Sequence, residues 1–222
     1  MRLRPFFSYY GSKWRLSPRY DEPLHGTVIE PFAGSACYSL YWHHKAVRLY
    51  DKSQVICSIW EYLITVSEAE VRKLPILKPG QAIPLSLPEG ARNLLGFWVT
   101  KGAATPGKSM TRNRNLGHWS PTMRERIASQ LQYIRHWSIT QSCYLDIPNT
   151  EATWFIDPPY KVGGHKYTEN KIDFPSLAEY CRTRKGQVTV CENGEAGWLP
   201  FTTFASTKGL KKTSTEVVWT NQ

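Results

Sequence analysis

The tetrapeptide Asp157-Pro158-Pro159-Tyr160 combines residue types suited to binding a planar amine. Two successive prolines remove two amide donors and stiffen the backbone, so carbonyl oxygens remain as fixed acceptors. The aspartate adds a carboxylate acceptor, and together these acceptors match the hydrogens of an exocyclic NH₂ group. The tyrosine offers a flat face on which a base could stack. The same residues are equally compatible with a proline turn after a strand, capped by Asp157.

A second set of candidate ligand-binding residues lies in the first part of the chain. The β-branched run 27–30 ends at Glu30 and leads into Pro31-Phe32-Ala33-Gly34, a strand-to-helix corner of the kind that binds nucleotides. Neither G-x-G-x-x-G nor G-x-x-x-x-G-K-[ST] occurs, which argues against a dinucleotide site and a P-loop. Asp51 follows about 20 residues later, where an acid bonds ribose hydroxyls. Taken singly, the corner is also an ordinary β–α turn and Asp51 a helix cap.

The segment from Pro5 to Lys13 places four aromatic residues beside a Gly-Ser-Lys turn. Such a segment could wall a ligand pocket and bring the Lys13 ammonium to an anionic group. It could equally be an aromatic stretch that docks on the core.

Strand and helix patterns alternate around these residues and predict an α/β fold with a parallel, doubly wound sheet. The expected strands cover residues 27–30, 46–50, 153–156 and 187–191. The expected helices cover residues 35–44 and 54–66, with another opening near Pro175. Two late runs, 201–205 and 216–220, predict a closing antiparallel hairpin.

The alternation is interrupted by a segment rich in proline, glycine and basic residues. The capping box Ser67-x-x-Glu70 predicts a short helix running to Leu74, and Ser120-Pro121 predicts the start of another. Little between them has a clear period apart from an apolar patch at 94–99. We therefore expect a catalytic core formed by residues 1–64 and 139–222, with residues 65–138 as an inserted, mainly helical subdomain.

The charge balance predicts a polyanionic partner. The chain has a formal net charge of +10 and a pI near 9.4. Residues 101–136 hold seven basic residues against one acid, and the first twenty residues hold five basic residues and no acid. No apolar run is long enough to span a bilayer, and mean hydropathy is −0.43. Five widely spaced cysteines without a C-x-x-C pair suggest buried thiols, with neither a disulfide framework nor a metal site. A soluble, cytoplasmic protein is expected.

Four ordered motifs together resemble a known family. The strings PFFSYYGSK, IEPFAGS, LYD and DPPY look like the signature of the Dam-like (alpha-group) adenine-N6 DNA methyltransferases. The insertion before the last motif is in the family's position. Residues 96–107 are similar to the family's recognition-domain hairpin, and residues 212–221, with Lys212 and Glu216, are similar to its C-terminal strand. The chain departs from the pattern at Ser12, Ala36, Cys37 and Lys52-Ser53.

The resemblance implies a Rossmann-like fold and S-adenosylmethionine as methyl donor, with S-adenosylhomocysteine as product and no metal. Asp157 and the Pro158 carbonyl would accept the N6 hydrogens of a flipped-out adenine, while Tyr160 stacks on the base. The cofactor would be held by Tyr9, Lys13, Glu30, Pro31, Phe32, Ala33, Gly34, Ser35, Asp51, Lys52, Phe155 and Asp157. The catalytic set would be Asp157, Pro158, Pro159 and Tyr160.

The resemblance further implies double-stranded DNA as substrate of a monomeric enzyme, encoded by a prokaryote or phage. Phosphates and base edges would be contacted by Lys101, Lys108, Arg112, Asn113, Arg114, Asn115 and Arg124. A solvated basic loop without sequence readout is an equal alternative for these residues. Three other functions remain open: an RNA adenine-N6 methyltransferase, an inert DNA-binding protein on the same fold, and, last, a protein-glutamine methyltransferase, which usually carries Asn in place of Asp157.

Overall fold

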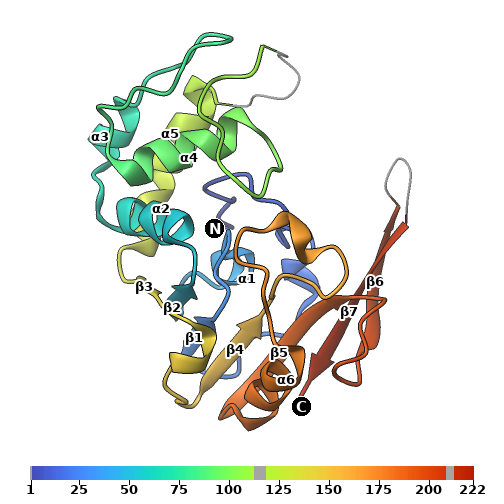
Figure 1. The fold of residues 1–222 in the computed structure, drawn as a ribbon. Coiled ribbons are helices and arrows are strands. Elements are labelled where there is room, and N and C mark those ends of the chain that lie inside the picture. Colours follow the sequence, from blue (N-terminus) through green and yellow to red (C-terminus); the bar gives the residue numbers. More distant parts are fainter. Residues whose placement is uncertain (1, 113–118, 209–212) are drawn as a thin grey trace.

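The computed structural model describes residues 2–112, 119–208 and 213–222, which form one seven-stranded sheet with helices on both faces (Figure 1). The strand order is β3-β2-β1-β4-β5-β7-β6. Neighbouring strands from β3 to β5 pair in parallel, whereas β7 is antiparallel to both β5 and β6. The strands are β1 (Thr27–Glu30), β2 (Ala46–Asp51), β3 (Ser138–Gln141), β4 (Ala152–Ile156), β5 (Gly186–Asn193), β6 (Thr202–Lys208) and β7 (Thr213–Thr220).

This order, with its antiparallel closing hairpin, is typical of the class I methyltransferase fold and confirms the predicted fold class. All five residues of the central strand β4 are buried, since helices cover both faces of a parallel sheet. The carboxyl ends of β1, β2 and β4 therefore meet at one edge, where ligands of open α/β sheets bind.

Six α-helices and four short 3₁₀ turns connect the strands in the described chain. The helices are α1 (Cys37–Tyr41), α2 (Gln54–Thr65), α3 (Glu68–Arg72), α4 (Glu89–Val99), α5 (Pro121–Gln130) and α6 (Phe174–Thr183). The 3₁₀ turns are η1 (Ser17–Arg19), η2 (Leu131–Ile134), η3 (Tyr144–Asp146) and η4 (Gly164–Lys166). Helices α3, α4 and α5 lie together beyond α2, at the end of the molecule away from the β6–β7 hairpin (Figure 1).

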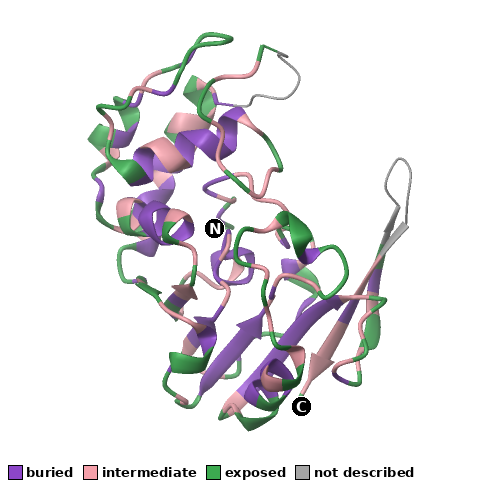
Figure 2. Ribbon diagram, viewed as in Figure 1, coloured by how far each residue is buried: buried purple, intermediate pink, exposed green. Residues whose placement is uncertain are grey.

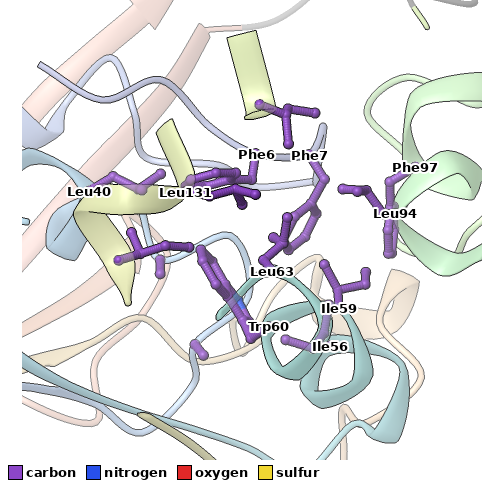
Figure 3. Packing of buried hydrophobic residues seen from close by; sticks show 14 of the residues in the cluster. Phe6, Phe7, Leu40, Ile56, Ile59, Trp60, Leu63, Leu94, Phe97 and Leu131 are labelled. Carbon is purple, nitrogen blue, oxygen red and sulfur yellow. The ribbon is translucent and has the colours of Figure 1, made fainter. Parts of the chain in front are cut away.

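The start of the chain joins this helical group to the rest of the core. Phe6 and Phe7 are fully buried between α2 and α4, close to Trp60 and Phe97 (Figure 3). The Phe7 ring centroid lies 5.8 Å from that of Trp60 and 5.4 Å from that of Phe97. Buried residues, drawn in purple, occur both in the strands of the sheet and in helices α2 and α4 (Figure 2). The helical group and the sheet thus share one hydrophobic cluster.

Most predicted helix starts are confirmed. Ser67 accepts from the Glu70 amide and the Glu70 carboxylate accepts from the Ser67 amide, so the capping box is present. The Ser120 hydroxyl caps α5 by accepting from the Met123 amide, with Pro121 as the first helical residue. Helix α1 is shorter than the expected 35–44. Its N-cap is Ala36 in the left-handed conformation, at a φ of +45°, so the helix starts only at Cys37.

Helix α4 and strand β3 were not predicted from the sequence, and the prediction of a hairpin over residues 96–107 is wrong. Residues 96–99 form the last turn of α4, and the chain returns so that the Gly107 amide donates to the Gly96 carbonyl. The edge strand β3 is short and mostly exposed, and therefore lacks the apolar signal of a strand. No helix in the described chain is long and apolar enough to cross a membrane. The five cysteines are free, and four of them are buried.

Candidate active site

The strand-to-helix corner after β1 is held tightly against the end of β2. Gly34 has a φ of +44°, which favours glycine, and a Cβ placed there would lie 3.1 Å from the Tyr9 ring. The Ala33 amide donates to the Tyr50 carbonyl (2.9 Å), and the Trp60 indole donates to the Gly34 carbonyl (2.9 Å). Aromatic residues from two other segments thus fix the path of the corner.

Asp51 faces this corner from the end of β2. Its Oδ2 accepts from the Gly34 amide (3.0 Å) and its Oδ1 from the Ser53 amide (2.9 Å). Burial raises the pKa of Asp51 to about 6, although these hydrogen bonds oppose the shift. Each carboxylate oxygen keeps a free lone pair, so the group can accept further hydrogen bonds from a diol.

Glu30 is a buried acid beneath helix α1. Its Oε1 accepts from the amide of Ser39 (2.8 Å), a residue in the first turn of that helix. The carboxyl group is only 3% exposed, and burial raises its pKa to about 8, while the bonds with Ser39 lower it. Glu30 therefore anchors the helix N-terminus from below, and its burial favours the protonated form of the carboxyl group.

The Asp157 carboxylate is paired with the Lys13 ammonium. The Nζ of Lys13 lies 2.8 Å from Oδ1 and 3.0 Å from Oδ2, and it also donates to the Gly11 carbonyl (3.1 Å). Glu216 of β7 lies 3.8 Å from the same ammonium. Burial raises the pKa of Asp157 and of Glu216, and the lysine opposes both shifts. The two acids, in turn, raise the pKa of Lys13 against its burial, so the ammonium remains charged.

Tyr160 completes this group from below. Its ring lies under the Lys13 ammonium, 4.7 Å from Nζ to the centroid, and its hydroxyl donates to Glu216 (2.9 Å). The Tyr20 hydroxyl donates to the same Glu216 oxygen (3.2 Å). The tyrosine that follows the two prolines is thus fixed by β7 rather than left free in the pocket.

Asp157, Cys191 and Glu216 are the one trio of potential metal ligands that lies within 4.8 Å in the described chain. The Lys13 ammonium already supplies positive charge to two of the three. Burial also raises the pKa of the Cys191 thiol well above its ordinary value.

The loop after Tyr160 covers the mouth of the pocket. The Tyr167 hydroxyl donates to the Tyr10 carbonyl (3.1 Å), and the Lys166 ammonium donates to the Tyr10 hydroxyl (3.1 Å). Further along, Glu169 pairs with Lys52 (3.2 Å) beside Asp51. The N-terminal aromatic segment and this loop thus enclose the space between the corner and Asp157.

One pocket contains every residue predicted to bind the cofactor, from Tyr9 to Asp157, together with Pro159. Pro158 is buried, and Tyr160 lies beneath Lys13. Sequence reasoning missed other parts of the wall, including Tyr10, Ser12, Cys37 and the residues Ser142, Cys143 and Tyr144. The last three follow β3, and only recognition of that strand would have pointed to them. Tyr144 packs its ring 5.4 Å from that of Phe32.

The basic residues predicted to contact DNA have different surroundings. Lys101, Lys108 and Arg112 are exposed in the helical group. The Arg124 guanidinium donates to the Leu74 carbonyl (2.7 Å) and so links α5 to the end of the α3 region. The predicted contacts Asn113, Arg114 and Asn115 lie outside the described residues.

Comparisons with solved structures find distant similarities. No family model matches the chain, and no curated protein matches it. The chain is similar to a conserved hypothetical protein of Streptococcus pyogenes, at 10% identity and a TM-score of 0.42, over 88% of this chain and 86% of that one. It is also similar to "Putative methyltransferase yhhF from Escherichia coli" (9% identity, TM-score 0.36, 86% and 73%) and to the "putative methylase HI0767 from Haemophilus influenzae" (10%, 0.37, 93% and 84%). The fold assignment rests on the strand order of the sheet, independently of these similarities.

Proposed function

We propose that this protein transfers a methyl group from S-adenosylmethionine to the exocyclic amine of adenine in DNA. The observation that supports this most directly is the meeting of two sites in one pocket. The corner around Gly34 and Asp51 follows strands β1 and β2, and Asp157 and Pro159 follow strand β4, yet all of these residues line the same cavity. The part of the cavity around Gly34 and Asp51 suits a nucleoside, and the part around Asp157 suits an amine.

The residues present fit the nucleoside part of the cofactor. Asp51 offers two carboxylate oxygens for the ribose hydroxyls, and Gly34 leaves open the space that a Cβ would fill beside Tyr9. Phe32 and Tyr144 form an aromatic wall next to Asp51 that suits an adenine ring. When bound, S-adenosylmethionine supplies an electrophilic methyl group on a sulfonium centre.

The amine of the target base would bind at Asp157. Its carboxylate accepts one amine hydrogen, and the Pro158 carbonyl would accept the other, which turns the nitrogen lone pair out of ring conjugation. Lys13 hydrogen-bonds Oδ2 of Asp157 and lies 2.8 Å from Oδ1, which is buried without a hydrogen-bond partner, so the ammonium has to move aside before the base can take Oδ1. Glu216, 3.8 Å from the ammonium, is a second partner toward which Lys13 can shift. The ammonium thus opposes protonation of Asp157 in the buried cluster, and its shift toward Glu216 would free the carboxylate for the base.

Positioning would supply most of the rate enhancement, since direct transfer needs the amine and the methyl group in line. Tyr160 would contribute by holding Lys13 and Glu216 in place, and its ring would bound the base-binding space from below.

The test is transfer of radiolabelled methyl from S-adenosylmethionine to unmethylated genomic DNA, with total RNA in parallel. Asp157→Ala and Asp157→Asn are the matched variants, and cofactor binding by calorimetry checks that their pockets are intact. Label in DNA adenine that both variants lose supports the proposal. Label confined to RNA would reassign the substrate, and substantial transfer by Asp157→Ala would contradict the mechanism.

A further inference from the structure

A second groove lies beside the active-site pocket and is strongly basic. It is bordered by Arg4, Arg15, Lys101 and Arg126, with the rings of Trp14 and Trp98 in its wall, and none of its lining residues is acidic. We call these six residues the basic groove. It is formed where the N-terminal segment, the end of α4 and the helix α5 meet.

The charges of the basic groove are not neutralised within the protein. Ion pairs among the described residues use Lys13, Lys52 and Arg72 as cations, and none involves the groove. The residues outside the described ranges include no Asp or Glu. Four cations gathered without an acid repel one another, and an anionic ligand would relieve that repulsion.

Among the cations of the basic groove, Arg126 is the one with a buried, unsatisfied hydrogen-bond donor. Its guanidinium lies 5.5 Å over the Trp98 ring and donates to the Pro5 carbonyl (2.9 Å), yet its Nε is buried without a hydrogen-bond partner. Burial and the neighbouring Arg4 lower its pKa to about 10. A buried donor of this kind costs free energy unless a ligand satisfies it.

The scaffold of the groove is rigid. The Gln130 side chain accepts from the Arg4 amide (2.7 Å) and donates to the Arg4 carbonyl (3.0 Å). The Trp98 indole donates to the Phe6 carbonyl (2.8 Å), and the Gly102 amide donates to Ser8 (3.0 Å). These bonds fix the backbone while the side chains of Arg4, Arg15 and Lys101 stay exposed.

The groove is adjacent to the active site, because Tyr9 and Ser12 line both cavities. We propose that the basic groove binds the phosphodiester backbone of a nucleic acid next to the nucleotide whose base enters the active site. That the groove binds a phosphodiester backbone is argued from the groove alone. That this backbone lies next to the nucleotide whose base enters the active site rests on the proposed function. Exposed cations beside aromatic rings are the usual means of holding a strand without reading its sequence.

The test compares two triple variants that lose the same charge. The groove variant carries Arg4→Gln, Arg15→Gln and Lys101→Gln. The control carries Arg48→Gln, Arg182→Gln and Lys185→Gln, three exposed residues that line neither cavity. Binding of a labelled DNA duplex and of a structured RNA is followed by fluorescence anisotropy over a series of salt concentrations. Melting temperature and S-adenosylmethionine binding are measured on all three proteins.

We expect the groove variant to bind at least about tenfold more weakly than the control, with a salt dependence lower by roughly three phosphate contacts. Cofactor affinity and melting temperature should match those of the control. Equal affinity of the two variants, or no nucleic-acid binding by the wild-type protein, would overturn the proposal. Normal groove-dependent binding without methyl transfer would contradict only the proposed function. The preferred probe, DNA or RNA, distinguishes the two sources of the phosphodiester backbone.

Discussion

The Nζ of Lys13 lies 2.8 Å from Oδ1 of Asp157, although 144 residues separate them in the chain. The pair joins the aromatic N-terminal segment to the carboxyl end of the central strand β4. Both side chains are largely buried, with 8% of Lys13 and 22% of Asp157 exposed. Burial raises the pKa of Asp157, and the ammonium opposes that shift. Both the stability of the site and its pH dependence therefore depend on this contact.

Replacing Lys13 with methionine should destabilise the protein and shift its activity to higher pH. Loss of one partner leaves a buried carboxylate without a counter-charge, at a cost of about 3 kcal/mol since Asp157 is partly exposed. Without the cation the pKa of Asp157 rises further, so the acid becomes protonated at pH values where the wild-type group is ionised. Urea unfolding and the pH profile of methyl transfer measure the two effects. Lys185→Met, at an exposed position, serves as control, and an unchanged acid limb in Lys13→Met would contradict this role.

Gly34→Ala should weaken cofactor binding more than it weakens the fold. A Cβ at this position meets the Tyr9 ring at 3.1 Å and imposes a left-handed conformation on alanine, at a cost of about 1–2 kcal/mol. Because the added methyl group also lies in the nucleoside part of the pocket, affinity for S-adenosylmethionine should fall by at least about tenfold. Calorimetry and thermal melting check this. Gly26→Ala, where a Cβ would meet nothing within 4 Å, should behave as wild type. Equal cofactor affinity in the two variants would count against the site.

Local patterns predicted the elements that carry the site. The strands β1, β4 and β5 are largely buried, and β2 has two buried residues at alternating positions. The ends of these strands placed Asp51 and Asp157 correctly at one edge of the sheet. Helix α4 was missed because its glycines resemble breakers. Gly90 packs against the backbone of Ser58, where a Cβ would lie 2.2 Å from the carbonyl oxygen, and Gly96 packs against Pro106. These glycines permit close packing, which a sequence pattern does not distinguish from a turn.

The contacts that Lys13 and Tyr160 make within the site could not be predicted from the sequence for a different reason. Lys13 was expected near the cofactor, and Tyr160 against the base. Their contacts with Asp157 and Glu216 depend on how the N-terminal segment and β7 meet across the sheet edge. Long-range contacts of this kind are set by tertiary packing and leave no periodic signal.

Glu30 should make stability fall as pH rises. Its pKa in the folded protein is about 8, above its ordinary value near 4.5, so the folded state binds the proton more tightly than the unfolded state. The stability that it contributes is therefore complete below pH 4.5 and is lost through pH 8, at about 1 kcal/mol per pH unit. Glu30→Gln keeps a carbonyl acceptor for the Ser39 amide and should flatten this dependence. Urea unfolding between pH 5 and 8 tests it, with the exposed Glu61→Gln as control. An identical slope in wild type and Glu30→Gln would refute the assignment.

Glu216→Gln should lower kcat while cofactor affinity stays unchanged. The amide still accepts a hydrogen bond from Tyr160, but it no longer attracts the Lys13 ammonium 3.8 Å away. If Lys13 has to shift toward Glu216 when the base takes an oxygen of Asp157, loss of this charge should slow turnover by about tenfold. Tyr20→Phe removes one hydrogen bond from the same carboxylate and leaves its charge, so its kcat should remain close to that of wild type. Single-turnover kinetics and calorimetry separate the two effects. A normal kcat in Glu216→Gln would mean that Lys13 releases Asp157 without a second partner.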